Sequence, residues 1–129
     1  MKNTKLFLLL LLPFFLFSQE KEKRLALVIG NANYDKGEIK NPVNDARLIA
    51  STLDSLDFDV ILKENLSTKK DMTAAIREFG SRHSEYDVAF VYYAGHGVQV
   101  DDENFLLPTK ETFERCLNFN SSLHTKKLL

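Results

Sequence analysis

The residue best suited to proton transfer is His96, which stands between Gly95 and Gly97 directly after an apolar run. An imidazole exchanges protons near neutral pH, so histidine is the most frequent general acid or base in active sites. Glycines on both sides would let the backbone turn sharply and let a substrate approach closely. A histidine in a loop can equally be an ordinary polar surface residue, so position alone predicts only a candidate base.

The remaining histidines and the single cysteine form weaker patterns. Cys116 is the only thiol, and no apolar strand precedes it. The spacings among His83, His96, Cys116 and His124 match no recognised zinc site, so no metal is predicted. One cysteine also forms no internal disulfide.

Acidic residues occupy two places of interest. Asp45 falls in the first turn of a predicted helix, where the helix macrodipole stabilises a carboxylate without any chemical role. Residues 101–103, Asp-Asp-Glu, could coordinate calcium, but their spacing fits no calcium loop and favours a charged hairpin turn. Residues 30–33 lack the P-loop and dinucleotide-binding patterns, so no cofactor is predicted.

Alternating strands and helices would position these residues. Continuous apolar runs predict strands buried on both faces, and apolar residues at spacings of three and four predict helices. The strands are expected at residues 25–29, 58–62 and 86–93, the helices at residues 41–53 and 68–83, and a hairpin at residues 97–107. This order predicts an α/β fold with right-handed crossovers and a parallel sheet flanked by helices. His96 would then lie at the carboxyl ends of the strands, where open sheets bind ligands.

Both predicted helices carry start signals. Asn41 followed by Pro42 is typical of an N-cap with proline at the first helical position. Thr68 and Asp71 predict a capping box. The second helix is expected to bury one side, formed by Met72, Ile76, Phe79 and His83. A third helix would begin near residue 121, so the sheet is expected to be incomplete, with an unpaired edge strand prone to association.

Residues 1–19 have the basic, apolar and polar order of a signal peptide, which predicts export to the periplasm, the surface or the medium. The apolar run is too short to span a bilayer, although an uncleaved anchor or a buried helix is the alternative. Cleavage would leave one domain, residues 20–129, with no stable membrane span. Loss of two lysines would leave 15 basic residues against 18 acidic ones, a net charge of −3 that offers nothing to nucleic acid.

Two segments resemble a known family. Residues 92–99, YYAGHGVQ, and 104–108, NFLLP, resemble the histidine motif of caspase-like cysteine peptidases, the branch of metacaspases, paracaspases and bacterial relatives in peptidase family C14. Segments near residues 26–34, 41–46 and 53–60 match the family's first strand, first helix and second strand in order. The resemblance covers residues 24–108 and implies the N-terminal part of a caspase-like p20 catalytic domain.

The resemblance implies endopeptidase activity by a cysteine–histidine dyad, with a protein or peptide as substrate. His96 takes the role of the base, and the backbone N–H of Gly97 that of an oxyanion donor. Asp45 matches an aspartate of the pocket for the P1 side chain, which implies a preference for Arg or Lys. Some relatives require calcium, but no motif here supports it.

The nucleophile is the missing part of this pattern. The family's cysteine follows a further strand, in an Asp-Ala-Cys-like motif some tens of residues after the histidine, whereas Cys116 comes only 20 residues after His96 (116 − 96) and lacks that motif. The sequence is therefore interpreted as ending before its nucleophile, and the 129-residue chain alone is expected to be inactive. The alternatives are a catalytically dead caspase-fold binding module and an unrelated flavodoxin-like or receiver-like domain. Sequence leaves the substrate, trigger and oligomeric state open.

Overall fold

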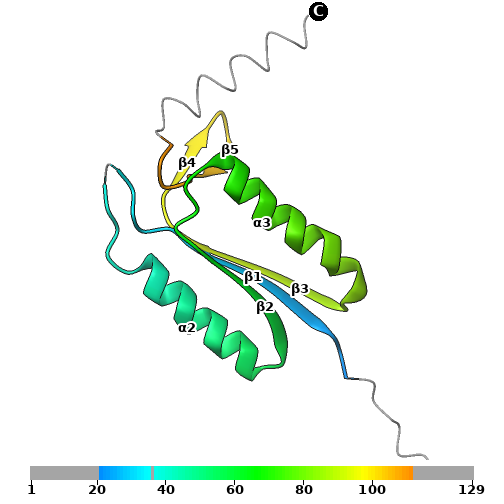
Figure 1. Ribbon diagram of the computed structural model, residues 1–129. Coiled ribbons are helices and arrows are strands. Elements are labelled where there is room, and N and C mark those ends of the chain that lie inside the picture. Colours follow the sequence, from blue (N-terminus) through cyan, green and yellow to red (C-terminus); the bar gives the residue numbers. More distant parts are fainter. Residues whose placement is uncertain (1–20, 36, 112–129) are drawn as a thin grey trace, which may run out of the picture.

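Strands and helices alternate along the part of the chain that the computed structural model describes, residues 21–35 and 37–111. Their order is β1 (Arg24–Gly30), α2 (Pro42–Ser55), β2 (Phe58–Glu64), α3 (Lys69–Arg82), the short 3₁₀ turn η2 (His83–Glu85), β3 (Val88–Ala94), β4 (Gly97–Val100) and β5 (Glu103–Leu106) (Figure 1). The predicted signal peptide and the predicted third helix lie outside the described residues. Among the described helices, none is long and apolar enough to cross a membrane.

The main sheet has the strand order β2-β1-β3, and both pairs of strands are parallel. Arg24 of β1 lies opposite Phe58 and Val88, so the three strands run in step from their first residues to their last. The carboxyl ends therefore reach one edge together, and the β4–β5 hairpin lies beyond that edge (Figure 1). This arrangement confirms the predicted α/β class with a parallel sheet flanked by helices.

The core sits on both faces of β1, because alternate residues of a strand point to opposite sides. On one face, Leu25, Leu27 and Ile29 pack with Met72 and Ala75 of α3. On the other face, residues 26 and 28 of the strand pack with residues 46, 50 and 53 of α2. Figure 1 shows the two helices on opposite sides of the sheet. The continuous apolar run is explained by this double coverage.

The two helix starts differ from each other. Thr68 is extended and accepts a bond from Asp71 N–H at 3.2 Å, while the Asp71 carboxylate accepts from Thr68 N–H at 2.9 Å, which confirms the capping box. Helix α2 begins at Pro42 as predicted, but the Asn41 side chain makes no capping bond. The Asn41 backbone is in the right-handed helical region rather than the extended conformation of a capping residue. Its predicted side-chain cap is therefore wrong.

Two further expectations need correction. Ile76 is 54% exposed and His83 is exposed as well, because α3 turns Met72, Ala75 and Phe79 toward the core. The hairpin turn is shorter than predicted, since Glu103 already belongs to β5 and only Asp101 and Asp102 form the turn. Both turn residues have positive φ, of 49° and 64°, as a two-residue hairpin turn of type I′ requires.

Candidate active site

His96 lies in the turn between β3 and β4, at the carboxyl edge of the sheet where the sequence placed it. The residue is partly buried, and both its backbone N–H and its backbone carbonyl make hydrogen bonds. The His96 N–H donates to the Tyr34 hydroxyl at 2.8 Å, and the His96 carbonyl accepts from Leu107 N–H at 3.0 Å. The residue is therefore fixed between the loop after β1 and the end of the hairpin.

The imidazole of His96 has a defined orientation. Its Nε2 lies 2.6 Å from the carbonyl oxygen of Gly37, and its ring packs against Tyr34 with centroids 4.4 Å apart. A carbonyl only accepts hydrogen bonds, so the neutral ring that makes this contact carries its proton on Nε2. Nδ1 is then the unprotonated nitrogen, as a general base requires.

Gly37 supplies more than its carbonyl to this contact. Its φ is +80°, a backbone conformation that residues with a Cβ rarely adopt. A Cβ at this position would also lie 3.3 Å from Nε2 of His96. Glycine therefore lets the loop bring its carbonyl close to the imidazole.

Asn31, the first residue after β1, is completely buried and connects the loops at the carboxyl edge of the sheet through hydrogen bonds. Its N–H donates to the Ala94 carbonyl at 2.8 Å, and its side-chain amide donates to the Leu107 carbonyl at 3.2 Å. Its side-chain oxygen accepts from Leu66 N–H at 2.9 Å. Asn65 acts similarly, because its side-chain oxygen accepts from both backbone N–H groups that follow Asn31, at 3.0 and 3.1 Å.

Two tyrosine hydroxyls meet beneath the histidine turn. The hydroxyls of Tyr34 and Tyr93 lie 3.0 Å apart, and the Tyr93 hydroxyl lies 2.9 Å from the carbonyl oxygen of His96 and 3.0 Å from that of Leu107, so it can donate to either one. Burial, followed by the hydrogen bond with Tyr34, raises the pKa of Tyr93 above its ordinary value. This hydroxyl is therefore neutral across the physiological pH range. Both tyrosines lie in segments that resemble the family, but their local sequence indicates no role for either.

The glycines beside His96 act differently from the prediction. Neither has a positive φ, so neither needs the left-handed backbone conformation that favours glycine. Gly95 leaves room instead, because a Cβ there would lie 2.5 Å from the Tyr93 hydroxyl oxygen. A Cβ on Gly97 would meet only the Phe105 carbonyl, at 3.4 Å.

The N–H of Gly97 is directed by the hairpin register. Leu107 N–H donates to the His96 carbonyl, and neighbouring residues in an antiparallel ladder point their polar groups in opposite directions. The N–H of Gly97, the next residue, is thus turned away from β5. Gly97 is also exposed, so a molecule bound at this edge could reach it.

Asp45 lies at the same edge of the sheet but in a different element. It is exposed in the first turn of α2, whose start packs closely on the end of β1, where a Cβ on Gly30 would lie 2.7 Å from the Ala46 Cβ. No described hydrogen bond or ion pair joins the Asp45 carboxylate to His96. The structure therefore places both residues at one edge without bringing them into contact.

The other candidates fall away from His96 or outside the described part. His83 caps the end of α3, with Nδ1 2.6 Å from the Gly80 carbonyl oxygen. Cys116 and His124 lie outside the described residues. Within residues 21–35 and 37–111, no three histidine, cysteine or acidic side chains gather as a metal site would require.

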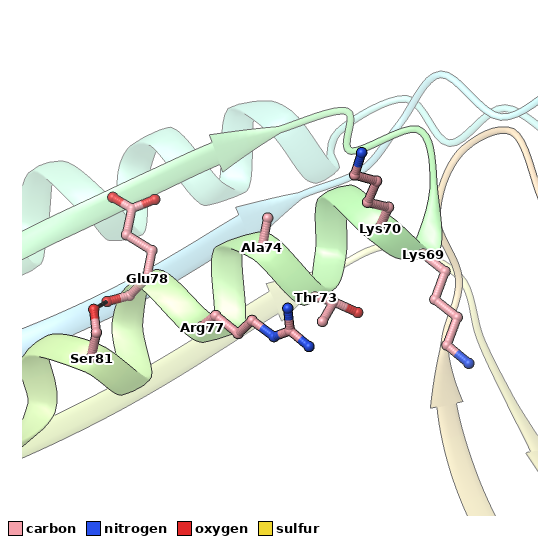
Figure 2. Close-up of a pocket in the computed structure, with 7 residues that line it drawn as sticks. All are labelled: Lys69, Lys70, Thr73, Ala74, Arg77, Glu78 and Ser81. Carbon is pink, nitrogen blue, oxygen red and sulfur yellow. Dashed lines mark hydrogen bonds between the residues drawn. The ribbon is translucent and has the colours of Figure 1, made fainter.

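A pocket on the surface of α3 is separate from these residues. Figure 2 shows its lining, which comes from that helix alone: Lys69, Lys70, Thr73, Ala74, Arg77, Glu78 and Ser81. Glu78 is already paired with Lys63 at 2.7 Å, and its carbonyl accepts from the Ser81 hydroxyl at 2.8 Å. The lining contains none of the residues singled out for proton transfer.

Comparison with known proteins identifies the family of this chain. Residues 23–128 match the caspase domain of peptidase family C14. Over 86 residues, or 66% of the chain, the sequence is 34% identical to human mucosa-associated lymphoid tissue lymphoma translocation protein 1 and 33% identical to its mouse homologue. Over 83 residues, or 62% of the chain, it is 32% identical to mouse caspase-12. The matches span only 10% of the first two proteins and 20% of caspase-12. Because the family match includes most of the sequence, the chain belongs to the caspase domain family of peptidases.

Proposed function

We propose that this domain is the histidine-bearing part of a cysteine-type endopeptidase that cleaves proteins or peptides with a cysteine–histidine dyad. The observation that carries the proposal is the orientation of His96, whose Nε2 faces the Gly37 carbonyl at 2.6 Å. That contact leaves Nδ1 to take a proton at the carboxyl edge of the sheet. The family membership supplies the reaction class.

In the proposed reaction, the thiol of the nucleophilic cysteine gives its proton to Nδ1 of His96, and the thiolate attacks the scissile carbonyl carbon. The tetrahedral intermediate then collapses as the imidazolium passes that proton to the leaving amine. Water, activated by the same imidazole, hydrolyses the acyl-enzyme and restores the thiol. Cys116 lacks the Asp-Ala-Cys-like motif, so it is not the cysteine proposed as the nucleophile.

Gly97 is proposed as an oxyanion donor. Its N–H points away from β5 and its residue is exposed, two conditions for reaching the carbonyl oxygen of a bound substrate. A backbone donor aimed at the developing negative charge stabilises the transition state more than the ground state. The N–H of the cysteine itself would be the second donor.

Asp45 is proposed to select a basic P1 side chain. Its carboxylate is exposed at the edge that carries His96, and a carboxylate binds Arg or Lys through charge-assisted hydrogen bonds. Asp45→Asn should lower kcat/KM for Arg and Lys substrates by roughly ten- to a hundredfold, because the negative charge that strengthens the hydrogen bond is removed. Asp54→Asn, at the other end of α2, is the matched control. Equal losses in both variants would rule out a pocket at Asp45.

The base assignment is tested on the protein that carries this domain together with its nucleophile. His96→Ala should reduce cleavage of Arg- or Lys-containing peptides by about 10²–10⁴-fold, the usual contribution of a general base. His83→Ala removes an exposed imidazole from the end of α3 and should leave cleavage unchanged. Full cleavage by His96→Ala would exclude His96 as the base.

A non-catalytic binding module is the second candidate, favoured by one observation: Cys116, the single cysteine of the sequence, lacks the nucleophile motif of the family. We expect no cleavage by the 129-residue chain alone. Cleavage that disappears in Cys116→Ala would instead identify Cys116 as the nucleophile. An apolar strand ending in Asp-x-Cys in the downstream coding sequence favours the peptidase, and its absence there favours the binding module.

A further inference from the structure

We propose that Tyr34 and Tyr93 are positioning residues for His96, and that their paired hydroxyls fix the histidine backbone at its N–H and its carbonyl. The proposal rests on the proposed function only for the catalytic meaning of His96. The positioning itself is a property of the described structure. It involves two elements, the loop after β1 and the strand β3.

Tyr34 contacts His96 in two ways. Its hydroxyl oxygen accepts from the His96 N–H at 2.8 Å, and its ring lies 4.4 Å from the imidazole with an angle of 59° between the planes. Tyr34 is buried, with 9% of its surface exposed, so water competes weakly for its hydroxyl. One rigid side chain thus holds both the main chain and the ring of His96.

Tyr93 completes the arrangement from the strand. Its hydroxyl lies 2.9 Å from the His96 carbonyl and 3.0 Å from both the Leu107 carbonyl and the Tyr34 hydroxyl. The Tyr34 hydroxyl lies 3.2 Å from the Leu107 carbonyl. If Tyr34 donates to Leu107 and Tyr93 donates to His96, every donor has an acceptor and Tyr34 remains free to accept from the His96 N–H. The arrangement therefore requires both hydroxyls to be protonated.

Gly95 shows that the space between the two tyrosines and the turn is filled. A Cβ on Gly95 would lie 2.6 Å from the Tyr34 hydroxyl oxygen and 2.5 Å from that of Tyr93. Real Cβ atoms do not approach other atoms so closely. The residue before His96 is thus a glycine because the hydroxyl pair occupies the place of a side chain.

The arrangement has a consequence for proton transfer. His96 needs Nε2 against the Gly37 carbonyl for Nδ1 to be the basic nitrogen, and this contact depends on where the backbone of His96 lies. Small displacements of a catalytic group reduce the rate of the chemical step strongly. Loss of either hydroxyl should therefore lower kcat more than it changes KM.

The test uses ¹⁵N-labelled 129-residue chain and the variants Tyr34→Phe and Tyr93→Phe, which keep the rings and remove only the hydroxyls. NMR measures the exchange rate of the His96 amide proton and the ¹⁵N shifts of its imidazole. We expect amide exchange about tenfold faster in Tyr34→Phe, since one hydrogen bond is lost. In both variants the imidazole shifts should move from the Nε2–H form toward a mixture of the two tautomers.

Tyr92→Phe is the matched control, because Tyr92 is the neighbouring residue of β3 and packs on the opposite face of the sheet, with the α2 cluster. It should leave the His96 signals unchanged. Unaltered His96 exchange and shifts in folded Tyr34→Phe and Tyr93→Phe would overturn the proposal. Unfolding of both variants while Tyr92→Phe stays folded would also overturn it, because the hydroxyls would then serve the fold as a whole.

The activity of the nucleophile-containing protein separates this proposal from the proposed function. If positioning matters for catalysis, Tyr34→Phe should lower kcat about tenfold with little change in KM. Changed His96 signals together with full cleavage by His96→Ala would leave the positioning intact and refute the peptidase mechanism. Changed signals with unchanged kcat in Tyr34→Phe would refute the positioning role in catalysis.

Discussion

Strands β1 and β3 are both seven-residue apolar strands and pair in parallel along their whole length, yet they are stabilised in different ways. In β1, residues 25–30 are all buried between the two helices. In β3, the middle is open, with Phe90 40% and Val91 56% exposed. The end of β3, in contrast, is held by hydrogen bonds through Tyr93 and through the Ala94 carbonyl.

The two strands differ in what they contribute: β1 contributes mainly to stability, and the end of β3 positions the candidate base. Burial on both faces makes β1 the centre of the core, but none of the residues proposed for the reaction lies in it. His96 follows the less buried strand and is positioned by directional bonds to hydroxyls and carbonyls, which determine orientation better than apolar packing does. We therefore expect substitutions in β1 to change mainly the free energy of unfolding, and substitutions at the end of β3 to change mainly the geometry of His96.

The largest expected effect is a difference in unfolding free energy between matched substitutions in the two strands. Leu27→Ala should lower the free energy of unfolding by about 2–5 kcal/mol, because Leu27 is 1% exposed and its removal leaves a cavity. Val91→Ala should lower it by less than about 1 kcal/mol, since the side chain is mainly in water. Urea denaturation followed by circular dichroism measures both. Similar losses in the two variants would mean that a further contact covers β3 in solution.

How far the sequence predicts this molecule depends on the kind of interaction. The run from Leu25 to Ile29 correctly predicts a strand buried on both faces, because hydrophobic burial follows directly from local composition. A similar run ending at Tyr93 does not reveal that Val91 is exposed, since exposure depends on which elements pack against the strand. Asn41 shows a related limit, because its residue type favours a cap that its backbone angles prevent.

For the site, the motif around His96 predicts the residue and its edge of the sheet, because both follow from local sequence. The groups that orient it come from distant positions. The Gly37 carbonyl and the Tyr34 hydroxyl are 59 and 62 residues away along the chain. No local pattern predicts such contacts, and a backbone carbonyl in particular has no residue type that would mark it.

Gly95→Ala gives the next largest effect and tests the packing beneath His96. The new methyl group would overlap both tyrosine hydroxyls, so we expect the free energy of unfolding to fall by about 1–3 kcal/mol. The His96 imidazole signals should change as well. Gly97→Ala is the matched control and should be far milder, because its Cβ meets only ordinary contact distances. Equal effects of the two substitutions would show that the hydroxyls do not fill the space beside Gly95.

Alkaline pH should lower the free energy of unfolding through the Tyr93 hydroxyl at the end of β3. The pKa of Tyr93 is raised in the folded state, mainly by burial, so the folded protein holds this proton more tightly than the unfolded chain does. Its contribution to stability is complete below about pH 10, the ordinary pKa of tyrosine, and is lost as the pH rises through the folded pKa. The urea concentration at the unfolding midpoint should fall less between pH 8 and pH 10.5 in Tyr93→Phe than in Tyr92→Phe. An identical fall in both variants would exclude Tyr93 as a source of the alkaline sensitivity.

The smallest expected effect is acid sensitivity at the other edge strand, β2. A hydrogen bond from Tyr86 lowers the pKa of Asp59, and the Arg47 guanidinium, 2.7 Å away, lowers that of Glu64. A lowered folded pKa stabilises the fold above the unfolded pKa of about 4, and this stability is lost as the pH falls through the folded value. The groups are near the surface, so the loss should be small. Urea midpoints between pH 6 and pH 3 should fall less steeply in Glu64→Gln. An equally steep fall in Glu64→Gln and in the unsubstituted protein would place the acid sensitivity outside this ion pair. Residues 25–30 of β1 carry no carboxylate, so no such sensitivity is expected from that strand.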